Sequence, residues 1–383
     1  MSLIFKENGL IVFDPTYIPE KIPHRESQFN TIIESLENGI KYNVFSIPII
    51  YGFSGTGKTT VVKKALIYLK EKYSREILTC YINAATTSKS YIAIQKMIEN
   101  VTPVPYRGLS ADEMIHKLYE VLDIRNVKYI VAIDDADELI RRERGKIIDI
   151  LSRIEEMYGR RLIYPVFILR DISVINGLAP YIRSKLGGPK IKFEPYNKTE
   201  LIDISMERIQ KGFKDNAISN NAIDACAYAV EKYFYGNARE LINLLYKAGK
   251  IAEYLGHSRI TTEIIRHALY DSFTKFQKFY YGENNINELK VLWILSKLLS
   301  KNIDKYKIFI RKNSKDLEAI KNIYKDIFKE EISEDSIIDI FNTITKREDS
   351  IICRDGDAFV LLASPAKVLS EKLSVILMRS TYY

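Results

Sequence analysis

The chain carries Gly52-Phe53-Ser54-Gly55-Thr56-Gly57-Lys58-Thr59-Thr60 directly after an apolar run. Up to Thr59 these residues form a complete GxxxxGK[ST] phosphate loop, and the periodicity that follows predicts a helix over Thr60–Tyr73. Glycines in such a loop let backbone N–H groups approach phosphate oxygens, and the start of the helix adds partial positive charge. Lys58 is expected to reach the β- and γ-phosphates, and the Thr59 hydroxyl to ligate Mg²⁺. The loop therefore predicts a site for ATP/ADP and Mg²⁺.

A second stretch, Tyr129-Ile130-Val131-Ala132-Ile133-Asp134-Asp135, has the composition of a buried strand that ends in two carboxylates. We expect this strand to lie beside the phosphate loop, with Asp134 holding Mg²⁺ through water. Asp135 stands where ATPases of this kind usually have glutamate as the base that activates water, and aspartate is shorter. The shorter side chain would displace the carboxylate, and a displacement of about 1 Å can cost roughly a hundredfold in rate. Two interpretations therefore remain: Asp135 is either a catalytic base or an ordinary strand-end residue.

Strand-like and helical segments alternate in the first half of the chain. The strand-like runs are Phe45–Tyr51, Ile77–Asn83, Tyr129–Asp134, Tyr164–Leu169 and Lys190–Phe193. This alternation predicts an α/β fold, a parallel sheet covered by helices. From about Glu194 the strand pattern stops, and helices are expected over Glu200–Gly212, Asn221–Tyr235 and Arg239–Leu255. We therefore predict a nucleotide-binding core over residues 1–193 and a smaller helical domain over residues 194–278.

Residues 279–383 are predicted to form a winged helix-turn-helix domain. About three helices precede the runs Ile351–Arg354 and Ala358–Leu362, and the Asp355-Gly356 turn between these runs is typical of a hairpin. The hairpin would place Arg354 against a phosphate backbone as part of a wing. The candidate recognition helix is Glu334–Lys346, whose acidic start would repel phosphate. Its outward residues would be Ser336, Asp339, Asn342, Thr343 and Lys346, and Arg347 follows directly.

The charge of the chain favours a nucleic-acid partner without requiring one. The formal net charge is +8, but the last hundred residues are nearly neutral, so charge alone does not mark them as the part that reads DNA. One stretch contains Lys301, Lys305, Lys307, Arg311, Lys312 and Lys315, opposed only by Asp304. This basic stretch is either a DNA contact or the solvated face of a helix.

The cysteines and the apolar runs exclude two further classes of protein. The three cysteines are widely spaced, so neither a disulfide framework nor a zinc knuckle is predicted. No run approaches the roughly 18 uninterrupted apolar residues of a membrane span, and the N-terminus lacks the apolar core of a signal peptide. We expect a cytoplasmic protein with no membrane partner.

Four further pieces of sequence accompany the phosphate loop. They are Tyr17-Ile18-Pro19-Glu20-Lys21-Ile22-Pro23-His24-Arg25-Glu26, Tyr81-Ile82-Asn83, Phe193-Glu194-Pro195-Tyr196 and Gly236-Asn237-Ala238-Arg239. In their order and spacing they resemble the archaeal origin-recognition initiators of the AAA+ class, relatives of the eukaryotic origin recognition complex and cell division control ATPases. The resemblance covers nearly the whole chain, and it implies an AAA+ core, a helical lid domain and a C-terminal winged helix.

The resemblance also assigns nucleotide contacts. In such proteins the N-terminal segment cradles adenine, a role that passes here to Ile18, Pro19, His24 and Arg25, with Tyr196 at the start of the lid as a further contact. Arg239 matches the arginine called sensor 2, which brings the lid onto the γ-phosphate. The alternative for Arg239 is an ordinary solvated arginine at the start of a helix.

A second DNA contact is implied after the second strand. Initiators insert a helical element there that touches the DNA backbone, and the corresponding region is Ala85–Pro103, which includes Lys89 and Lys96. The alternative is an ordinary core helix.

Two departures from the family pattern bear on hydrolysis. Arg170 stands where the family usually has the sensor 1 asparagine that orients the attacking water, and arginine can donate but not accept hydrogen bonds. Tyr181 replaces the usual first arginine of a nearby pattern, which leaves Arg183 as the candidate to act in trans on a neighbour's nucleotide. The alternative for Arg183 is a surface cation. Together with Asp135, these changes indicate a divergent paralogue that hydrolyses ATP slowly.

Three functions remain open from the sequence. The first, implied by the resemblance, is an ATP-switched initiator that binds double-stranded DNA at a replication origin and helps recruit or load the replicative helicase. Such a protein would be nucleoid-associated and would work with another initiator subunit. The second is a signalling or mobile-element ATPase of the STAND type whose winged helix contacts protein. The third is a non-hydrolysing paralogue that acts as a structural partner on DNA.

Overall fold

The computed structural model describes residues 2–43, 46–86, 89–102, 108–270, 285–347, 350–362 and 364–380. The chain divides into two compact units. The first, called the sheet unit, comprises Ile18–Tyr196 and Gly236–Ala238. The second, called the helical unit, comprises Met1–Tyr17, Asn197–Tyr235 and Arg239–Tyr383.

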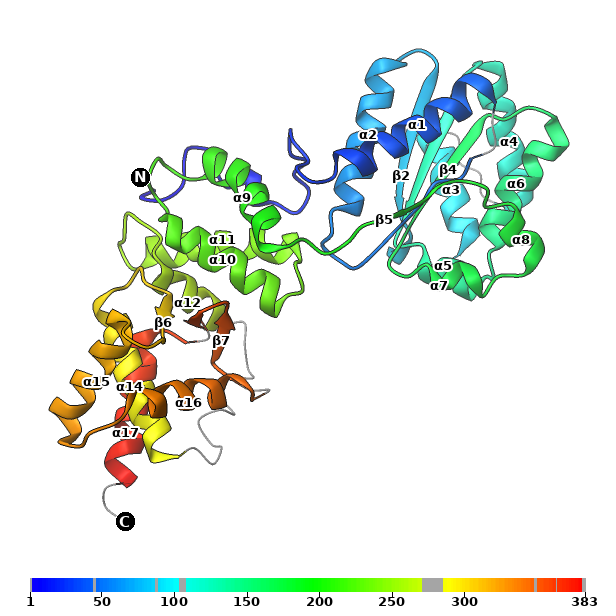
Figure 1. Cartoon of the computed structure of the whole chain (residues 1–383). Coiled ribbons are helices and arrows are strands. Elements are labelled where there is room, and N and C mark those ends of the chain that lie inside the picture. The colour runs from blue at the N-terminus through cyan, green and yellow to red at the C-terminus, as the bar shows by residue number, and fades with distance from the viewer. Residues whose placement is uncertain are drawn as a thin grey trace. The chain divides into compact units, whose positions relative to one another are not determined.

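The sheet unit contains a five-stranded sheet in the order β2-β3-β4-β1-β5, with every neighbouring pair parallel (Figure 1). Its strands are β1 Ile49–Tyr51, β2 Ile77–Asn83, β3 Lys128–Asp134, β4 Ile163–Leu169 and β5 Lys190–Lys192. All of β4 is buried, as expected for a parallel strand covered on both faces. The predicted α/β fold is confirmed, although β1 begins only at Ile49, and Phe45 lies outside the described residues.

Helices cover both faces of the sheet, because alternate side chains of each strand join different hydrophobic clusters. One face packs on α1 Glu26–Tyr42 and α2 Lys58–Lys72. The other face packs on α3 Ser90–Val101, α4 Ala111–Ile124, α5 Asp137–Arg142 and α6 Lys146–Tyr158. The short helices α7 Ser173–Asn176 and α8 Pro180–Ser184 follow β4 in the chain, and the 3-10 turn Ala84–Thr86 follows β2.

The helical unit begins with α9 Lys198–Gly212, α10 Asn220–Tyr233, α11 Ala238–Tyr254 and α12 Thr262–Tyr270. The N-terminal segment, which includes the 3-10 turn Ile11–Phe13, packs here. Phe5 and Phe13 form an aromatic cluster with Phe213 and Tyr246, with ring centroids 5.0–6.3 Å apart. The first seventeen residues therefore belong to the helical unit, whereas we predicted a core over residues 1–193.

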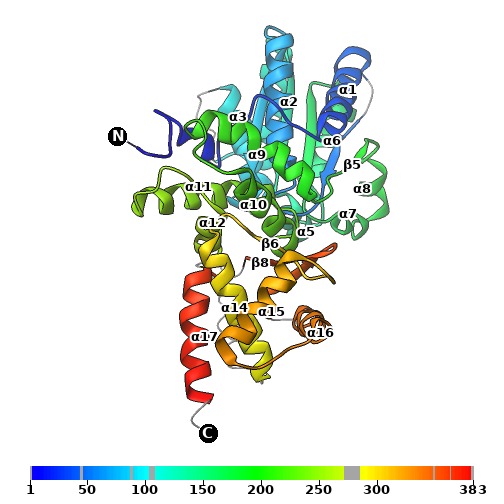
Figure 2. The same ribbon diagram turned by 60° about the vertical axis from the view of Figure 1, so that its left-hand side comes forward.

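The C-terminal part of the helical unit is a winged helix, as predicted. Its elements are α14 Ile286–Lys301, β6 Lys307–Phe309, α15 Lys315–Phe328, α16 Glu334–Thr345, β7 Ile352–Asp355, β8 Ala358–Leu361 and α17 Ala366–Ser380. The predicted hairpin gains β6 as a third strand, in the antiparallel order β6-β8-β7. The last helix, α17, was not predicted and packs along α14 (Figure 2).

A buried polar network joins α12 to the winged helix. Arg266 is fully buried and donates to the carbonyl oxygens of Leu361 at 2.9 Å and Lys305 at 2.6 Å. It also pairs with Glu263 at 2.8 Å, whose other carboxylate oxygen accepts the backbone N–H of Ala366 at 2.7 Å. Because each of these groups would be costly to bury alone, the network holds α12 and the winged helix together. Among the described helices, none is long and apolar enough to cross a membrane.

Candidate nucleotide-binding site

The phosphate loop lies tightly against two other segments of the sheet unit. Gly57 has φ +93°, and a Cβ added there would lie 2.5 Å from the Tyr196 hydroxyl oxygen. Gly55 has φ +75°, and its added Cβ would lie 1.7 Å from Asn237 Oδ1. Glycine is therefore required at both positions by backbone conformation and by space.

Lys58 points into the loop. Its ammonium donates to the carbonyl oxygens of Gly52 at 2.6 Å and Phe53 at 2.7 Å, and only 8% of the residue is exposed. Burial lowers the pKa of the Lys58 ammonium, while the nearby carboxylates of Asp134, Asp135 and Asp137 oppose this shift. The cation is thus held where the phosphate groups of a nucleotide would need it.

Asp134 receives three hydrogen bonds. The hydroxyls of Thr59 and Tyr81 both donate to its Oδ2 at 2.6 Å, and the backbone N–H of Asp135 donates to Oδ1 at 2.8 Å. The Thr59 hydroxyl and the Asp134 carboxylate thus present adjacent hard oxygen atoms in a site where Asp134 is only 3% exposed. These are ligand types that suit Mg²⁺, which retains several waters and takes one or two protein oxygens beside nucleotide phosphates.

Tyr81 is a site residue that was not predicted from the sequence. It lies on β2, two residues before Asn83, whose Cα partner on β3 is Asp134. Burial and the hydrogen bond to Asp134 raise the pKa of the Tyr81 phenol, so this hydroxyl remains a donor. Only the strand register could have revealed the contact, because the sequence separates the two residues by almost an entire βαβ crossover.

Asp135 and Arg170, two departures that directly follow β3 and β4, contact each other. Arg170 Nε lies 3.0 Å from Asp135 Oδ1, and Asp135 adopts a left-handed backbone with φ +50°. The backbone N–H of Arg170 donates to both carboxylate oxygens of Asp137, at 3.0 and 2.9 Å. The end of β4 is therefore attached to the segment that follows β3.

Arg25 is a structural clamp rather than an exposed contact. The residue is 5% exposed, and its guanidinium donates to the carbonyl oxygens of Thr56 at 3.1 Å, His24 at 2.9 Å and Glu194 at 2.5 Å. It also lies 3.8 Å from the centroid of the Tyr196 ring. Arg25 therefore holds the N-terminal segment against the phosphate loop, and its contact with adenine stays a prediction.

The other adenine candidates lie on the same segment. Ile18 and Pro19 are half-buried, and the Lys64 ammonium donates to the Pro19 carbonyl oxygen at 3.1 Å. His24 is exposed and adopts a left-handed backbone with φ +64°. Their contacts with adenine stay predictions.

The segment before Arg239 closes onto the loop. The backbone N–H of Ala238 donates to the Gly55 carbonyl oxygen at 3.0 Å. The backbone N–H of Tyr196 donates to the Gly236 carbonyl oxygen at 3.2 Å. Arg239 follows directly in the first turn of α11 and is exposed. Its predicted γ-phosphate contact stays a prediction.

The trans-acting candidate Arg183 lies on α8. Ile182 is buried while Tyr181 and Arg183 are exposed on either side of it. Lys185, just after α8, pairs at 3.1 Å with the buried carboxylate of Asp149 on α6. This ion pair fixes the helix that presents Arg183.

The predicted DNA contacts are distributed over both units. Lys89 is exposed directly before α3, and Lys96 is half-buried on it. Most of the inner face of α3, from Ala93 to Val101, belongs to the main hydrophobic cluster, so this helix is part of the core. Of the region 85–103, residues 87, 88 and 103 lie outside the described residues.

The basic stretch Lys301–Lys315 does not lie on one helix. The interpretation of this stretch as the solvated face of a helix is therefore wrong. It spans the end of α14, β6 and the start of α15. Three of its lysines form ion pairs: Lys305 with Asp316, Lys307 with Asp355 at 2.9 Å, and Lys312 with Asp335 at 3.0 Å. These carboxylates lie outside the stretch in the sequence. The charges within the stretch therefore did not reveal that its lysines have acidic partners.

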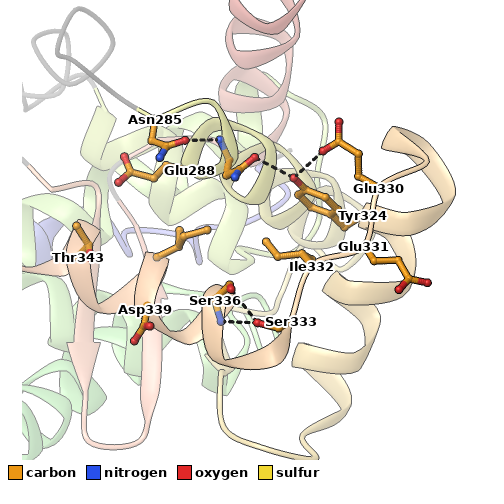
Figure 3. A pocket seen from close by; sticks show the side chains of 12 residues that line it. Asn285, Glu288, Tyr324, Glu330, Glu331, Ile332, Ser333, Ser336, Asp339 and Thr343 are labelled. Atoms are coloured by element: carbon orange, nitrogen blue, oxygen red, sulfur yellow. Dashed lines mark hydrogen bonds between the residues drawn. The ribbon is translucent and has the colours of Figure 1, made fainter.

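The two ends of α16 differ in charge. Its N-terminal end carries Glu334 and Asp335, and a pocket of about 580 Å³ lies along the helix from Ser333 to Thr343. It is lined by the carboxylates of Glu288, Glu330, Glu331 and Asp339, among other side chains (Figure 3). At the other end Lys346 is exposed, whereas Arg347 pairs with both carboxylate oxygens of Glu288, at 2.9 and 2.8 Å. Any phosphate contact of α16 is therefore favoured at Lys346, beyond the pocket. Asn342 is half-buried, and the exposed Thr343 lines the pocket.

The predicted wing packs against α10. The Tyr228 hydroxyl donates to the Arg354 carbonyl oxygen at 3.4 Å, and the Tyr233 hydroxyl lies 3.1 Å from Cys353 Sγ. The exposed Arg354 side chain donates to the carbonyl oxygen of Gly356 at 3.1 Å. Its contact with a DNA backbone stays a prediction.

Comparison with protein families finds two matches. Residues 46–169 match an AAA domain, and residues 202–269 match the Cdc6 AAA+ ATPase-type lid domain. Among curated proteins, ORC1-type DNA replication protein 1 of Sulfurisphaera tokodaii is 33% identical over 269 residues, which cover 70% of this chain and 67% of the relative. The ORC1-type DNA replication protein of Desulfurococcus amylolyticus is 31% identical over 271 residues, 70% of this chain and 68% of the relative.

Solved structures share the fold. Cdc6p from Pyrobaculum aerophilum superposes with a TM-score of 0.83 at 23% identity, covering 98% of this chain and 99% of that chain. The Aeropyrum pernix ORC1 protein in complex with DNA superposes with a TM-score of 0.62 at 24% identity, covering 100% of both chains. These matches support an AAA+ fold with a lid and a winged helix.

Proposed function

The chain belongs to the family of ORC1-type DNA replication proteins, and from this membership we propose that it is an ATP-binding initiator that recognises duplex DNA at a replication origin. In this proposal the sheet unit binds ATP/ADP with Mg²⁺, and the winged helix contacts DNA. The protein would act at the nucleoid, beside another initiator subunit, and help recruit or load the replicative helicase.

The observation that carries the nucleotide part is the contact between the phosphate loop and the strand-end carboxylate. Thr59 Oγ1 lies 2.6 Å from Asp134 Oδ2, and the buried Lys58 ammonium lies within the same loop. Magnesium bound there would neutralise charge on the phosphates, while Lys58 would bind their oxygens and Arg25 would hold the loop in shape. Asn237, Tyr196 and the glycines keep this loop tightly packed.

The proposal that the winged helix contacts DNA rests on the fold of the chain and on its relatives. The winged helix is present, and a relative of the same fold, the Aeropyrum pernix ORC1 protein, was solved in complex with DNA. The acidic pocket beside α16 would repel phosphate, so we expect little base readout through that side of the helix. A winged helix that contacts only protein is the competing account.

A second candidate is a paralogue that binds ATP but barely hydrolyses it. The ion pair between Arg170 and Asp135 favours this candidate, because it occupies the carboxylate that would have to accept a proton from water. In that case the bound nucleotide acts mainly as a conformational lock.

The test compares wild type with Lys58→Ala and with Lys70→Ala. Lys70 is an exposed lysine on the same helix, so its replacement removes an equal charge outside the site. Lys58→Ala should abolish tight ATP binding, and Lys70→Ala should not. Wild type should bind duplex DNA at low salt, with an affinity that changes when ATP is added. Unchanged nucleotide affinity in Lys58→Ala, or no duplex binding by wild type, would overturn the proposal.

A further inference from the structure

Tyr81 contacts the carboxylate at which the proposed metal site is built. Its hydroxyl donates to Asp134 Oδ2 at 2.6 Å, the same oxygen that accepts the Thr59 hydroxyl. The other oxygen, Oδ1, accepts the backbone N–H of Asp135 at 2.8 Å. Among the residues that the structure describes, the side chains that donate to Asp134 are Tyr81 and Thr59, and Thr59 is itself a candidate metal ligand.

We propose that Tyr81 is a positioning residue that orients the Asp134 carboxylate toward the Mg²⁺ of a bound nucleotide. This inference rests on the proposed nucleotide site. A Thr59 oxygen that binds the metal through a lone pair can still donate its proton to Asp134, so Thr59 and Tyr81 would fix the carboxylate together. Of these two donors, Tyr81 is the one that is not itself a candidate metal ligand. Hydrogen bonds to metal-ligating carboxylates hold the ligand in one orientation and typically account for about 10- to 100-fold in metal affinity.

The position of Tyr81 is itself fixed by its surroundings. Strand register pairs it with Ala132 on β3, and its half-buried ring packs against the cluster beneath α2. The Lys63 ammonium lies 4.3 Å from the ring centroid, close enough for a cation–π interaction. These contacts involve the ring rather than the hydroxyl, so Tyr81→Phe retains them and removes only the hydroxyl, which contacts Asp134 and Thr59.

The experiment measures Mg²⁺ dependence rather than turnover. Affinity for fluorescent ADP is determined in EDTA, and Mg²⁺ is then titrated into the complex of each purified full-length variant. Tyr81→Phe should leave the affinity in EDTA unchanged and raise the half-saturating Mg²⁺ concentration about 10- to 100-fold. Tyr129→Phe is the matched control, because that buried tyrosine on β3 donates to the Met97 carbonyl oxygen at 2.9 Å, away from Asp134. It should leave the Mg²⁺ midpoint unchanged.

A double-mutant cycle tests the route through Asp134. In an Asp134→Asn background, Tyr81→Phe should have no further effect on the Mg²⁺ midpoint, because the carboxylate that it orients is gone. A further loss of the same size in that background would overturn the inference and indicate a general structural role.

The remaining outcomes separate this inference from the function on which it rests. An unchanged Mg²⁺ midpoint in Tyr81→Phe would overturn the inference alone. A lower midpoint would overturn it too, since it would mean that the phenol competes with the cation for Asp134. Failure of the wild type to bind ADP would instead overturn the nucleotide site and the inference together.

Discussion

Arg170 Nε lies 3.0 Å from Asp135 Oδ1, so two residues that depart from the family pattern, each directly after a strand, form an ion pair with each other. The side chains are 64% and 30% exposed, respectively. An ion pair this exposed to water contributes only about 0–1 kcal/mol to stability. Its main consequence is orientation, because it directs the Asp135 carboxylate toward the end of β4.

The first prediction concerns hydrolysis. Wild type should turn over ATP slowly, and Asp135→Glu combined with Arg170→Asn should raise kcat, since glutamate reaches farther and asparagine can orient water. Because the two side chains contact each other, the double variant should gain more than the two single variants suggest. Single-turnover hydrolysis of radiolabelled ATP measures all four proteins. A wild-type rate already in the range of roughly 1–100 per second would contradict the prediction.

The second prediction concerns Arg25. Arg25→Lys keeps the charge but cannot reach three carbonyl oxygens and stack on Tyr196 at once. Leaving buried acceptors unpaired should lower the free energy of unfolding by about 2–3 kcal/mol and weaken ATP binding. Arg75→Lys, at an exposed arginine of the same unit, should change neither quantity. Thermal unfolding and nucleotide titration check both effects. Equal behaviour of the two variants would show that Arg25 does not clamp the loop.

Local patterns in the sequence were sufficient to predict the loop, the strands and the helices that carry the site. The phosphate loop, the strand that ends in Asp134 and the alternation of strand and helix depend on spacing within short segments, and the structure contains each of them. The candidate recognition helix is present as α16, with the Ser333 side chain accepting the Ser336 N–H as its N-cap. Ile337, Phe341 and Ile344 are buried on it, and Ile340 is partly buried.

Contacts between distant segments could not be read from those patterns. Tyr81 contacts Asp134 only because β2 and β3 pair in one register, and Arg25 becomes a clamp only when Thr56 and Glu194 approach it. The lysines of the basic stretch are neutralised by aspartates elsewhere in the unit, as Lys307 is by Asp355. Strand β6 has three residues, too few for a period to be detected.

The third prediction concerns pH and the support of α8. The Arg153 guanidinium holds the pKa of the Asp149 carboxyl below its ordinary value of 3.8, with burial opposing and Lys185 assisting this shift. A carboxyl with a depressed pKa in the folded state contributes stability above its unfolded pKa and loses it as the pH falls through the folded value. Asp149→Asn should therefore destabilise the protein by about 1–3 kcal/mol near neutral pH.

The difference between wild type and Asp149→Asn should begin to shrink below about pH 4 and stay constant above it. Urea unfolding at a series of pH values measures it. The control is Asp123→Asn, because Asp123 is half exposed and its pair with Arg160 lies at the surface. A difference that grows as the pH falls would refute this assignment.

The last prediction separates two neighbouring cations at the end of α16. Lys346 is exposed and makes no ion pair with any residue that the structure describes, whereas Arg347 is bound to Glu288, a side chain with only 9% of its surface exposed. If the C-terminal end of α16 contacts phosphate, Lys346→Ala should weaken binding to all duplexes similarly. It should also flatten the slope of log affinity against log salt by about 0.9, the contribution of one phosphate. Stability should not change.

Arg347→Ala should have the opposite profile, since it leaves the Glu288 carboxylate buried without its cation. We expect a loss of about 1–3 kcal/mol in unfolding free energy and little change in the salt slope. Urea unfolding and salt titrations on random and origin-derived duplexes measure the two effects separately. A smaller salt slope in Arg347→Ala with unchanged stability would place Arg347 on DNA and show that its pairing with Glu288 opens on binding. An unchanged slope in Lys346→Ala would move the phosphate contact away from this helix, because one lost contact is large enough to be measured.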